Sequence, residues 1–205
     1  MKSSFICDQL TLEQAARIHI LNSIEVQQQV TQFCLDSIVL AAQVIAQSIH
    51  KGGKLLLCGN GGSAADCQHL AGEFINCLSK DFRREGLPAI ALTTDTSILT
   101  SIANDSGYTY IFERQVRALG QRNDVLLGIS TSGNSANVVQ AVKTANQLGL
   151  STVALTGEGK LLGEIAEVAI QVPHDNTQHI QEAHLVIEHI LCRLVEIHLF
   201  EERGL

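Results

Sequence analysis

Two stretches of the sequence decide the expected fold: KLLLCGNGGS at residues 54–63 and DVLLGISTSGNS at residues 124–135. Each is a short apolar run that ends in a turn of Gly, Asn, Ser and Thr, and a segment with helical spacing follows each turn. A strand that is buried on both faces of a parallel sheet has this nearly continuous apolar pattern. The repeated design therefore predicts the strand–turn–helix units of an α/β protein.

Three more apolar runs extend the predicted sheet, in LPAIALTTD, STVALTGEG and EVAIQVP. Together the runs predict five parallel strands in a doubly wound layer, near residues 54–58, 88–92, 125–129, 151–155 and 167–172. Apolar residues recur at helical spacing before the first strand and after the last one. We therefore expect one domain over residues 1–205, with N-terminal helices in 1–50 (near 11–30 and 32–50), an α/β core in 51–175 and a C-terminal helix in 176–205.

The composition of the chain narrows the class of protein. A net charge of -7 provides no basic patch for the backbone of nucleic acid, so no nucleic-acid partner is expected. No run approaches the roughly 18 apolar residues of a membrane span. The start, MKSSFICDQLTLEQAA, lacks the apolar core of a secretion signal. We expect a cytoplasmic protein with no membrane partner.

The six cysteines stand at positions 7, 34, 58, 67, 77 and 192 and form no C-x-x-C pair. Without a secretion signal, free thiols in a reducing compartment are the expected state. Zinc held by cysteine is not expected on this spacing.

Both polar turns are expected at the carboxyl ends of their strands, where ligands of open α/β sheets bind. The start of the following helix attracts phosphate, because its N–H groups are unpaired and carry partial positive charge. Glycines admit a ligand close to the backbone and hydroxyls donate to it. The residues concerned are Gly59, Gly61, Gly62, Ser130, Thr131, Ser132 and Ser135.

Ordinary turn and N-cap chemistry is the alternative explanation for either turn alone. Two such turns at equivalent places in one sheet favour binding. Neither turn has the Lys of a P-loop or the glycine spacing of a dinucleotide site. The expected ligand is therefore a single phosphate that hydroxyls and backbone N–H groups hold.

A candidate metal or acid–base set follows the first turn. His69 and Glu73 are four residues apart and share a helix face, and Gln181 and His189 lie eight apart on the last helix. Imidazole nitrogen with carboxylate and amide oxygen suits a zinc-like ion. The alternative stays open, since exposed His–Glu pairs are common on helices and most polar residues of the last helix are expected to be solvated or packed.

Four segments together resemble the phosphoheptose isomerase family of the sugar isomerase (SIS) fold: CGNGGSAADCQHLAGE, SIANDSGY, LLGISTSGNSANVV and IQEAHLVIEHIL. The resemblance covers residues 53–196 and the N-terminal helical region. It implies a three-layer α/β/α sandwich with a five-stranded parallel sheet and extra N-terminal helices, assembled as a homotetramer. It also implies the conversion of sedoheptulose 7-phosphate to D-glycero-D-manno-heptose 7-phosphate through an enediol(ate), the first step towards ADP- or GDP-heptose.

The same resemblance implies roles for particular residues. One zinc per subunit is expected on His69, Glu73, Gln181 and His189. Proton transfer is expected from Glu73 and His189. Substrate contacts are expected from Asn60, Gly61, Gly62, Glu73, Asn104, Asp105, Ser130, Thr131, Ser132, Ser135 and Gln181.

Two positions depart from the family pattern. Cys77 stands where many members have an arginine, and His179 stands where many have the first residue of an Arg-Ile-Gln-Glu run. Two other functions are therefore weighed: an isomerase of another sugar phosphate, and a non-catalytic regulator of the same fold that binds the replication initiator DnaA. The presence of Glu73 and His189 favours the enzyme.

Overall fold

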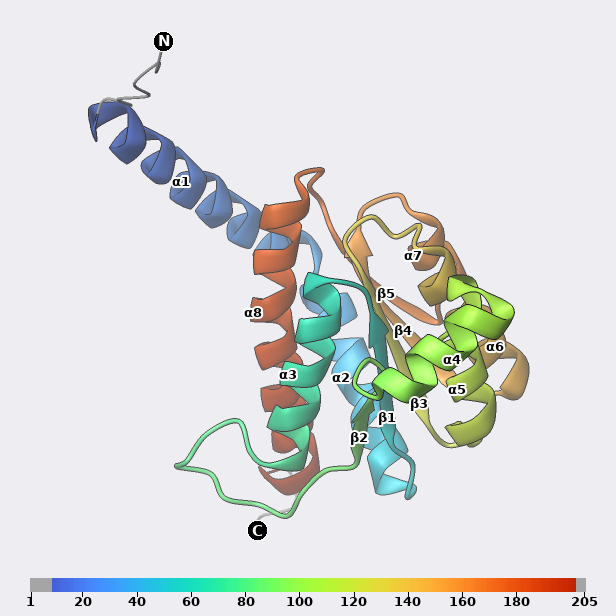
Figure 1. Ribbon diagram of the computed structural model, residues 1–205. Coiled ribbons are helices and arrows are strands. Elements are labelled where there is room, and N and C mark those ends of the chain that lie inside the picture. The colour runs from blue at the N-terminus through green and yellow to red at the C-terminus, as the bar shows by residue number, and fades with distance from the viewer. Residues whose placement is uncertain (1–8, 202–205) are drawn as a thin grey trace.

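The computed structural model describes residues 9–201. Its centre is a parallel sheet with the strand order β2-β1-β3-β4-β5 (Figure 1). The strands are β1 (Leu55–Gly59), β2 (Ala89–Ala91), β3 (Val125–Ser130), β4 (Ser151–Gly157) and β5 (Val168–Val172). The strand order reverses between β1 and β3, which pair along their whole length. The two polar turns therefore lie side by side at the switch point, where open α/β sheets bind ligands.

Helices cover both faces of the sheet, so the molecule has three layers (Figure 1). One outer layer consists of α2 (Leu35–His50), α3 (Gly62–Ile75) and α8 (Thr177–Glu196). The other consists of α4 (Thr96–Ser106), the short helix η1 (Tyr108–Tyr110), α5 (Glu113–Leu119), α6 (Ala136–Leu148) and α7 (Leu161–Ile165). The helix α1 (Gln9–Phe33) precedes these layers, and the π-helical segment η2 (Ile197–Glu201) follows α8.

Alternation along the strands explains why the apolar runs are continuous. In β1, Leu55 and Leu57 face the core under α2, α3 and α8, whereas Leu56 and Cys58 face the core on the other side. Successive side chains of a strand point to opposite faces. A strand with helices on both faces therefore needs a buried side chain at each position, and all of β1 and β3 is buried.

The predicted fold class is confirmed: the protein is α/β, with five parallel strands and N-terminal helices. The strand ends differ from the predicted ones by one or two residues. The sequence analysis did not predict α4, η1, α5 or α7. These elements give a weak signal, because α4 has no buried residue and α5 and α7 span only seven and five residues. Of the predicted C-terminal helix, residues 202–205 lie outside the described part.

Five of the cysteines lie in the described range and all five are free thiols, whereas Cys7 lies outside it. Within residues 9–201, no single helix is long and apolar enough to cross a membrane. The helices α1 and α2 pass that test of length and composition only as a pair that is bent by 70°.

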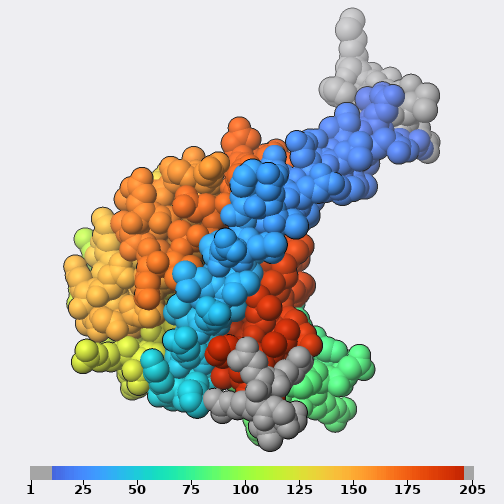
Figure 2. Space-filling model, turned by 180° about the vertical axis from the view of Figure 1, so that it is seen from behind, coloured from blue at the N-terminus to red at the C-terminus, as the bar shows by residue number. Residues whose placement is uncertain are grey.

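The first turns of α1 stand clear of the rest of the molecule (Figure 2), and further along His19 contacts Glu182 of α8. Its later residues Val26 and Val30 are buried in the core. Several large apolar side chains of α1 are about half exposed or more; these are Leu12, Ile18, Ile20, Leu21 and Ile24. So many exposed apolar side chains on one helix are typical of a surface that another molecule covers.

Candidate active site

The turn between β3 and α6 brings hydroxyl groups together, and we call Ser130, Thr131, Ser132 and Ser135 the serine cradle. The Oγ atom of Ser130 lies 3.0 Å from that of Ser135 and 3.3 Å from that of Ser132. Ser135 is the N-cap residue of α6, and its side chain makes no capping hydrogen bond. The serine cradle therefore lies at a helix start, where the N–H groups and the helix dipole favour an anion.

Gly133 fixes the shape of this turn. Its φ is +59°, and a Cβ atom there would lie 2.2 Å from Cβ of Lys160 and 2.5 Å from Oγ1 of Thr156. Only glycine accepts this conformation in this space. Its backbone N–H donates to Oγ of Ser130 over 3.1 Å. The backbone thus holds the buried Ser130 hydroxyl in one place.

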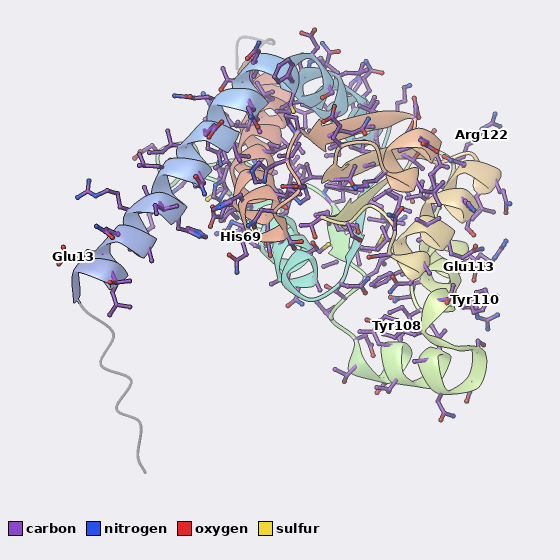
Figure 3. All side chains as sticks on the ribbon, turned by 90° about the horizontal axis from the view of Figure 1, so that it is seen from above. Glu13, His69, Tyr108, Tyr110, Glu113 and Arg122 are labelled. Carbon is purple, nitrogen blue, oxygen red and sulfur yellow. The ribbon has the colours of Figure 1, made fainter. Side chains whose placement is uncertain are left out.

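The turn after β1 is tied to the serine cradle by a pair of amides. Asn60 and Asn137 each donate to the other's side-chain oxygen over 2.8 Å. The hydroxyl of Tyr108 donates to Oδ1 of Asn60 over 3.0 Å, and Figure 3 labels this tyrosine. Tyr108 follows the exposed pair Asn104 and Asp105, whose side chains bond to each other over 2.8 Å. The segment after α4 therefore reaches the first polar turn.

The glycine at the start of α3 makes room for a side chain of α8. A Cβ atom on Gly62 would lie 2.0 Å from Nε2 of Gln181. The same amide nitrogen donates to Oδ2 of Asp66 over 3.1 Å. Burial raises the pKa of Asp66, although the hydrogen bond from Gln181 and the nearby His69 act in the opposite direction. Gln181 is thus held between the first polar turn and α3.

Further along, α3 and α8 run side by side (Figure 1), and their contact carries the predicted catalytic residues. We call His69, Glu73 and His189 the catalytic trio, because Glu73 and His189 are the predicted proton-transfer pair and His69 is a predicted metal ligand beside them. The Nε2 atoms of His69 and His189 lie 2.9 Å apart, with the two rings edge to face. His69, labelled in Figure 3, and His189 are exposed to solvent. Glu73 is half-buried, and its Oε2 atom is buried without a hydrogen-bond partner.

The end of α3 at Glu73 is capped by a residue that the sequence analysis missed. The guanidinium of Arg84 donates to the backbone oxygens of Glu73 and Phe74 over 2.9 and 2.7 Å. It also pairs with Oε1 of Glu196 over 2.8 Å, and both side chains of this ion pair are 1% exposed. A cation at a helix C-terminus satisfies the last carbonyl groups. Arg84 therefore fixes the turn of α3 that carries Glu73.

The buried face of α8 carries two titratable groups, His184 and Glu188, and neither carboxylate oxygen of Glu188 has a hydrogen-bond partner. Burial, assisted by the charge of Asp66, raises the pKa of Glu188 to about 9. Burial lowers the pKa of His184 to about 4. Both side chains are therefore neutral at pH 7. The expectation that most polar residues of this helix are packed or solvated holds for these two.

A second cluster joins α1 to the start of α8. The Nε2 atom of His19 lies 2.7 Å from Oε1 of Glu182, and Nδ1 of His179 lies 3.1 Å from Oε2. Burial opposes ionisation of Glu182, but hydrogen bonds from His19, Ser23 and His179 outweigh it and lower its pKa to about 2. Among residues 9–201, His19, His179 and Glu182 form a group of three potential metal ligands. One candidate ligand atom from each side chain lies within 4.8 Å of those of the other two. The protein therefore has a cluster that can hold a metal ion.

That cluster does not contain the residues from which zinc binding was predicted. Of the predicted ligands, the structure brings His69 and His189 into contact, and Glu73 follows His69 by one helical turn. Gln181 contacts Asp66 and Gly62 instead, two turns from His189. Along α3, Glu73 lies 11 residues after Gly62, or about 16 Å. The serine cradle and Glu73 are thus near opposite ends of α3 within one chain.

This arrangement, with a five-stranded parallel sheet and a hydroxyl-rich turn at its switch point, belongs to a known class. The sequence pattern of the SIS domain family matches residues 18–157. The phosphoheptose isomerase of Roseiflexus sp. is 49% identical over 181 residues, which cover 88% of this chain and 91% of that protein. The corresponding protein of Neisseria gonorrhoeae is 45% identical over 195 residues, 93% of this chain and 98% of the relative.

Solved structures agree with the sequence matches. The phosphoheptose isomerase of Francisella tularensis superposes with a TM-score of 0.86 at 36% identity and covers 90% of this chain and 98% of its own. The N. gonorrhoeae enzyme gives a TM-score of 0.85 at 43% identity and covers 91% and 99%. This chain therefore belongs to the phosphoheptose isomerase family of SIS domain proteins.

Proposed function

We propose that this protein is an aldose–ketose isomerase that converts sedoheptulose 7-phosphate to D-glycero-D-manno-heptose 7-phosphate, a step of heptose biosynthesis. Family membership supplies the reaction class. The observation that carries the proposal is the contact of His69 with His189 beside Glu73, whose buried oxygen lacks a partner. An unpartnered carboxylate oxygen next to two imidazoles suits a reaction that moves a proton between neighbouring carbons.

The serine cradle is proposed to hold the phosphate. Its hydroxyls and the start of α6 offer donors, and neither polar turn itself contains a Lys or Arg, which fits a single phosphate group. Across the Asn60–Asn137 pair, the turn at Gly61 and Gly62 would contact the sugar. Asn104, Asp105 and Gln181 complete the proposed contacts, because the first two lie in the last turn of α4, shortly before Tyr108, which reaches that turn, and Gln181 lies against Gly62.

Glu73 is proposed to act as the base that moves the proton between C1 and C2, with His189 as its acid–base partner. Such a positioned pair typically accelerates proton transfer by ~10²–10⁴-fold. The Arg84 cap holds the backbone of Glu73, so the carboxylate keeps one position relative to His189. In the ketose-to-aldose direction Glu73 takes a proton from C1, an enediol(ate) forms, and the proton is delivered to C2, while His189 as acid–base partner serves the transfer of the hydroxyl proton from the C1 oxygen to the C2 oxygen.

A zinc-like ion is proposed to bind to His69, Glu73, Gln181 and His189, one per chain. Three of these donors are suitable, since the two imidazole nitrogens converge and Glu73 has a buried oxygen without a partner, whereas Gln181 lies two turns of α8 from His189. When bound, such an ion would act as a Lewis acid on the sugar oxygens. Elemental analysis of metal-reconstituted protein tests the site: His69→Ala should lose the ion, and equal content in wild type and variant would disprove this ligand set.

We also propose a homotetramer, with residues 1–205 of each chain as a single SIS domain. The exposed apolar side chains of α1 supply a surface that another copy would cover. The separation of the serine cradle from Glu73 along α3 favours an assembly in which two copies complete one site. Light scattering should return four chains per particle, and a monomer at micromolar concentration would contradict this.

The free thiols fit a reducing compartment, so the proposed location is the cytoplasm.

The test of the function is direct. Purified protein is incubated with sedoheptulose 7-phosphate, and NMR follows the appearance of the aldoheptose phosphate. Turnover of another sugar phosphate but not of this one would assign the chain to a different isomerase. No turnover of any sugar phosphate, together with binding to DnaA, would replace the enzyme with the regulator.

A further inference from the structure

The contact between α1 and α8 contains a set of metal-binding atoms outside the catalytic trio. His19 lies on α1, and His179 and Glu182 lie in the first turns of α8. Each oxygen of Glu182 faces one imidazole nitrogen, at 2.7 Å from His19 and at 3.1 Å from His179. The two imidazole rings are 4.4 Å apart between centroids. Three donors from two separate helices thus converge on one place.

Local structure holds two of the three donors in position. Asn176 caps α8 by accepting hydrogen bonds from the N–H groups of Gln178 and His179. His179 and Glu182 are three residues apart and therefore share one helix face. The side chain of His179 is only 3% exposed, whereas those of His19 and Glu182 are 45% and 37% exposed. The cluster is fixed on one side and open to solvent on the other.

The donor chemistry matches a particular class of ion. Two imidazoles and one carboxylate, with water in the remaining position, form a common zinc donor set, with bonds of roughly 2.0–2.2 Å. Tetrahedral coordination at those bond lengths separates the ligand atoms by roughly 3.4 Å. The present distances from Glu182 to the two imidazole nitrogens are 2.7 and 3.1 Å, so small outward movements of the exposed side chains His19 and Glu182 would bring the ligand atoms to this separation. His174, also near His179, offers no donor through Nδ1, because that nitrogen accepts from the N–H of Asn176.

The surroundings of the cluster give an ion access and space for water. A pocket of about 380 Å³ is lined by His19, Asp66, Gln178, Gln181, Glu182 and Leu185. The cluster borders this pocket and connects α1 to the helix that carries Gln181 and His189. An ion bound here would therefore hold α1 against α8.

We propose that His19, His179 and Glu182 form a second divalent-metal site, of the Zn²⁺, Co²⁺ or Ni²⁺ class, that cross-links α1 to α8. The site is independent of the one proposed at the catalytic trio. Its effect is structural: metal binding restricts the opening of α1 from the body of the molecule and leaves the chemistry to α3 and the later turns of α8.

Zinc stoichiometry and affinity test the proposal on the full-length, metal-stripped protein. Isothermal titration calorimetry compares wild type with His179→Gln, His19→Gln and the control His50→Gln, which changes an exposed histidine of α2. Loss of a second-shell partner weakens metal binding by roughly 10–100-fold, so loss of a ligand should weaken this site by at least about tenfold. The variants at 179 and 19 should each lose one equivalent of tight zinc, and the control should lose none.

His69→Ala separates the two sites. If the catalytic trio binds no zinc, the wild-type protein should bind one zinc in total. His69→Ala should keep that zinc and His179→Gln should lose it, and the proposal of a site on His19, His179 and Glu182 then stands. Circular dichroism checks that each variant folds. As a second measurement, zinc should slow hydrogen exchange in α1 of wild type but not of His179→Gln. Unchanged zinc binding in His179→Gln and His19→Gln would show that the three residues form only a hydrogen-bonded clamp. Unchanged exchange in α1 with zinc would show that the ion does not hold α1 against α8.

Discussion

The serine cradle and the catalytic trio are built in opposite ways. The cradle comes from residues 130–135, one continuous turn whose hydroxyls bond to one another and to the backbone. The trio comes from two helices, and His69 and His189 are 120 residues apart. Its carboxylate keeps a buried oxygen without a partner. A turn can be preformed to bind a ligand by hydrogen bonds among its own residues. A reactive side chain must instead keep an atom without a hydrogen-bond partner, so neighbouring residues have to hold it in position.

The largest expected effect comes from removing the proposed base, Glu73. Glu73→Gln keeps the shape of the side chain and removes its basicity. We expect kcat to fall by ~10²–10⁴-fold, the usual contribution of a general base, with little change in stability. Steady-state kinetics and a denaturation curve measure the two effects. A kcat within a few-fold of wild type would remove Glu73 from the chemistry.

The next effect concerns Arg84, which holds the backbone of the proposed base Glu73. Arg84→Ala removes one partner of a buried ion pair and the cap of α3. Breaking such a pair destabilises proteins by about 3–5 kcal/mol, and we expect that loss in the free energy of unfolding by urea. Arg83→Ala is the matched control, since Arg83 is its exposed neighbour. Equal stability of the two variants would show that the cap does not hold Glu73.

A substitution in the serine cradle should affect substrate binding more than kcat. Ser135→Ala removes one donor at the start of α6. A hydrogen bond to a charged group contributes about 1.5–3 kcal/mol, so kcat/KM should fall by roughly 10–100-fold, mainly through a higher KM. Asn134→Ala, on the exposed part of the same turn, is the control. A fall that appears in kcat alone would place Ser135 in the chemical step, contrary to this comparison.

The smallest effect is a change in pH dependence. His184 has a folded-state pKa of about 4, below the ordinary value of 6.5, so only the unfolded chain takes up a proton between these values. Stability from this group is therefore present above pH 6.5 and is lost as pH falls toward 4. His184→Gln should remove that loss, on the order of 1 kcal/mol between pH 6.5 and 5. The free energy of unfolding of both proteins is measured across this pH range. The same pH dependence in wild type and His184→Gln would contradict the lowered pKa of His184.

The difference between the two regions also explains what the sequence could reveal. The strands and both polar turns were predictable because each depends on a few consecutive residues. Nothing local distinguishes His189 from the buried His184 on the same helix, since only the packing of α8 exposes one and covers the other. The pairing of His69 with His189 was accessible through family resemblance alone.

Contacts between distant charged residues were the least predictable part. Arg83 and Arg84 are identical neighbours in the sequence, yet only the second reaches under α3 to Glu196. The cluster of His19 with His179 and Glu182 joins residues 163 positions apart. Such contacts depend on how whole helices dock, and no spacing rule encodes them.

Proton exchange is the most direct test of the proposal that the serine cradle binds the phosphate and Glu73 transfers the proton. Sedoheptulose 7-phosphate at saturating concentration is incubated in D₂O with wild type, Glu73→Gln and Ser135→Ala, and NMR records the uptake of deuterium at the reacting carbons. We expect Ser135→Ala to exchange at nearly the wild-type rate, whereas exchange by Glu73→Gln should fall by at least ~10²-fold. Exchange by Glu73→Gln as fast as wild type, with the fold intact, would contradict the assignment of the base to the α3–α8 contact.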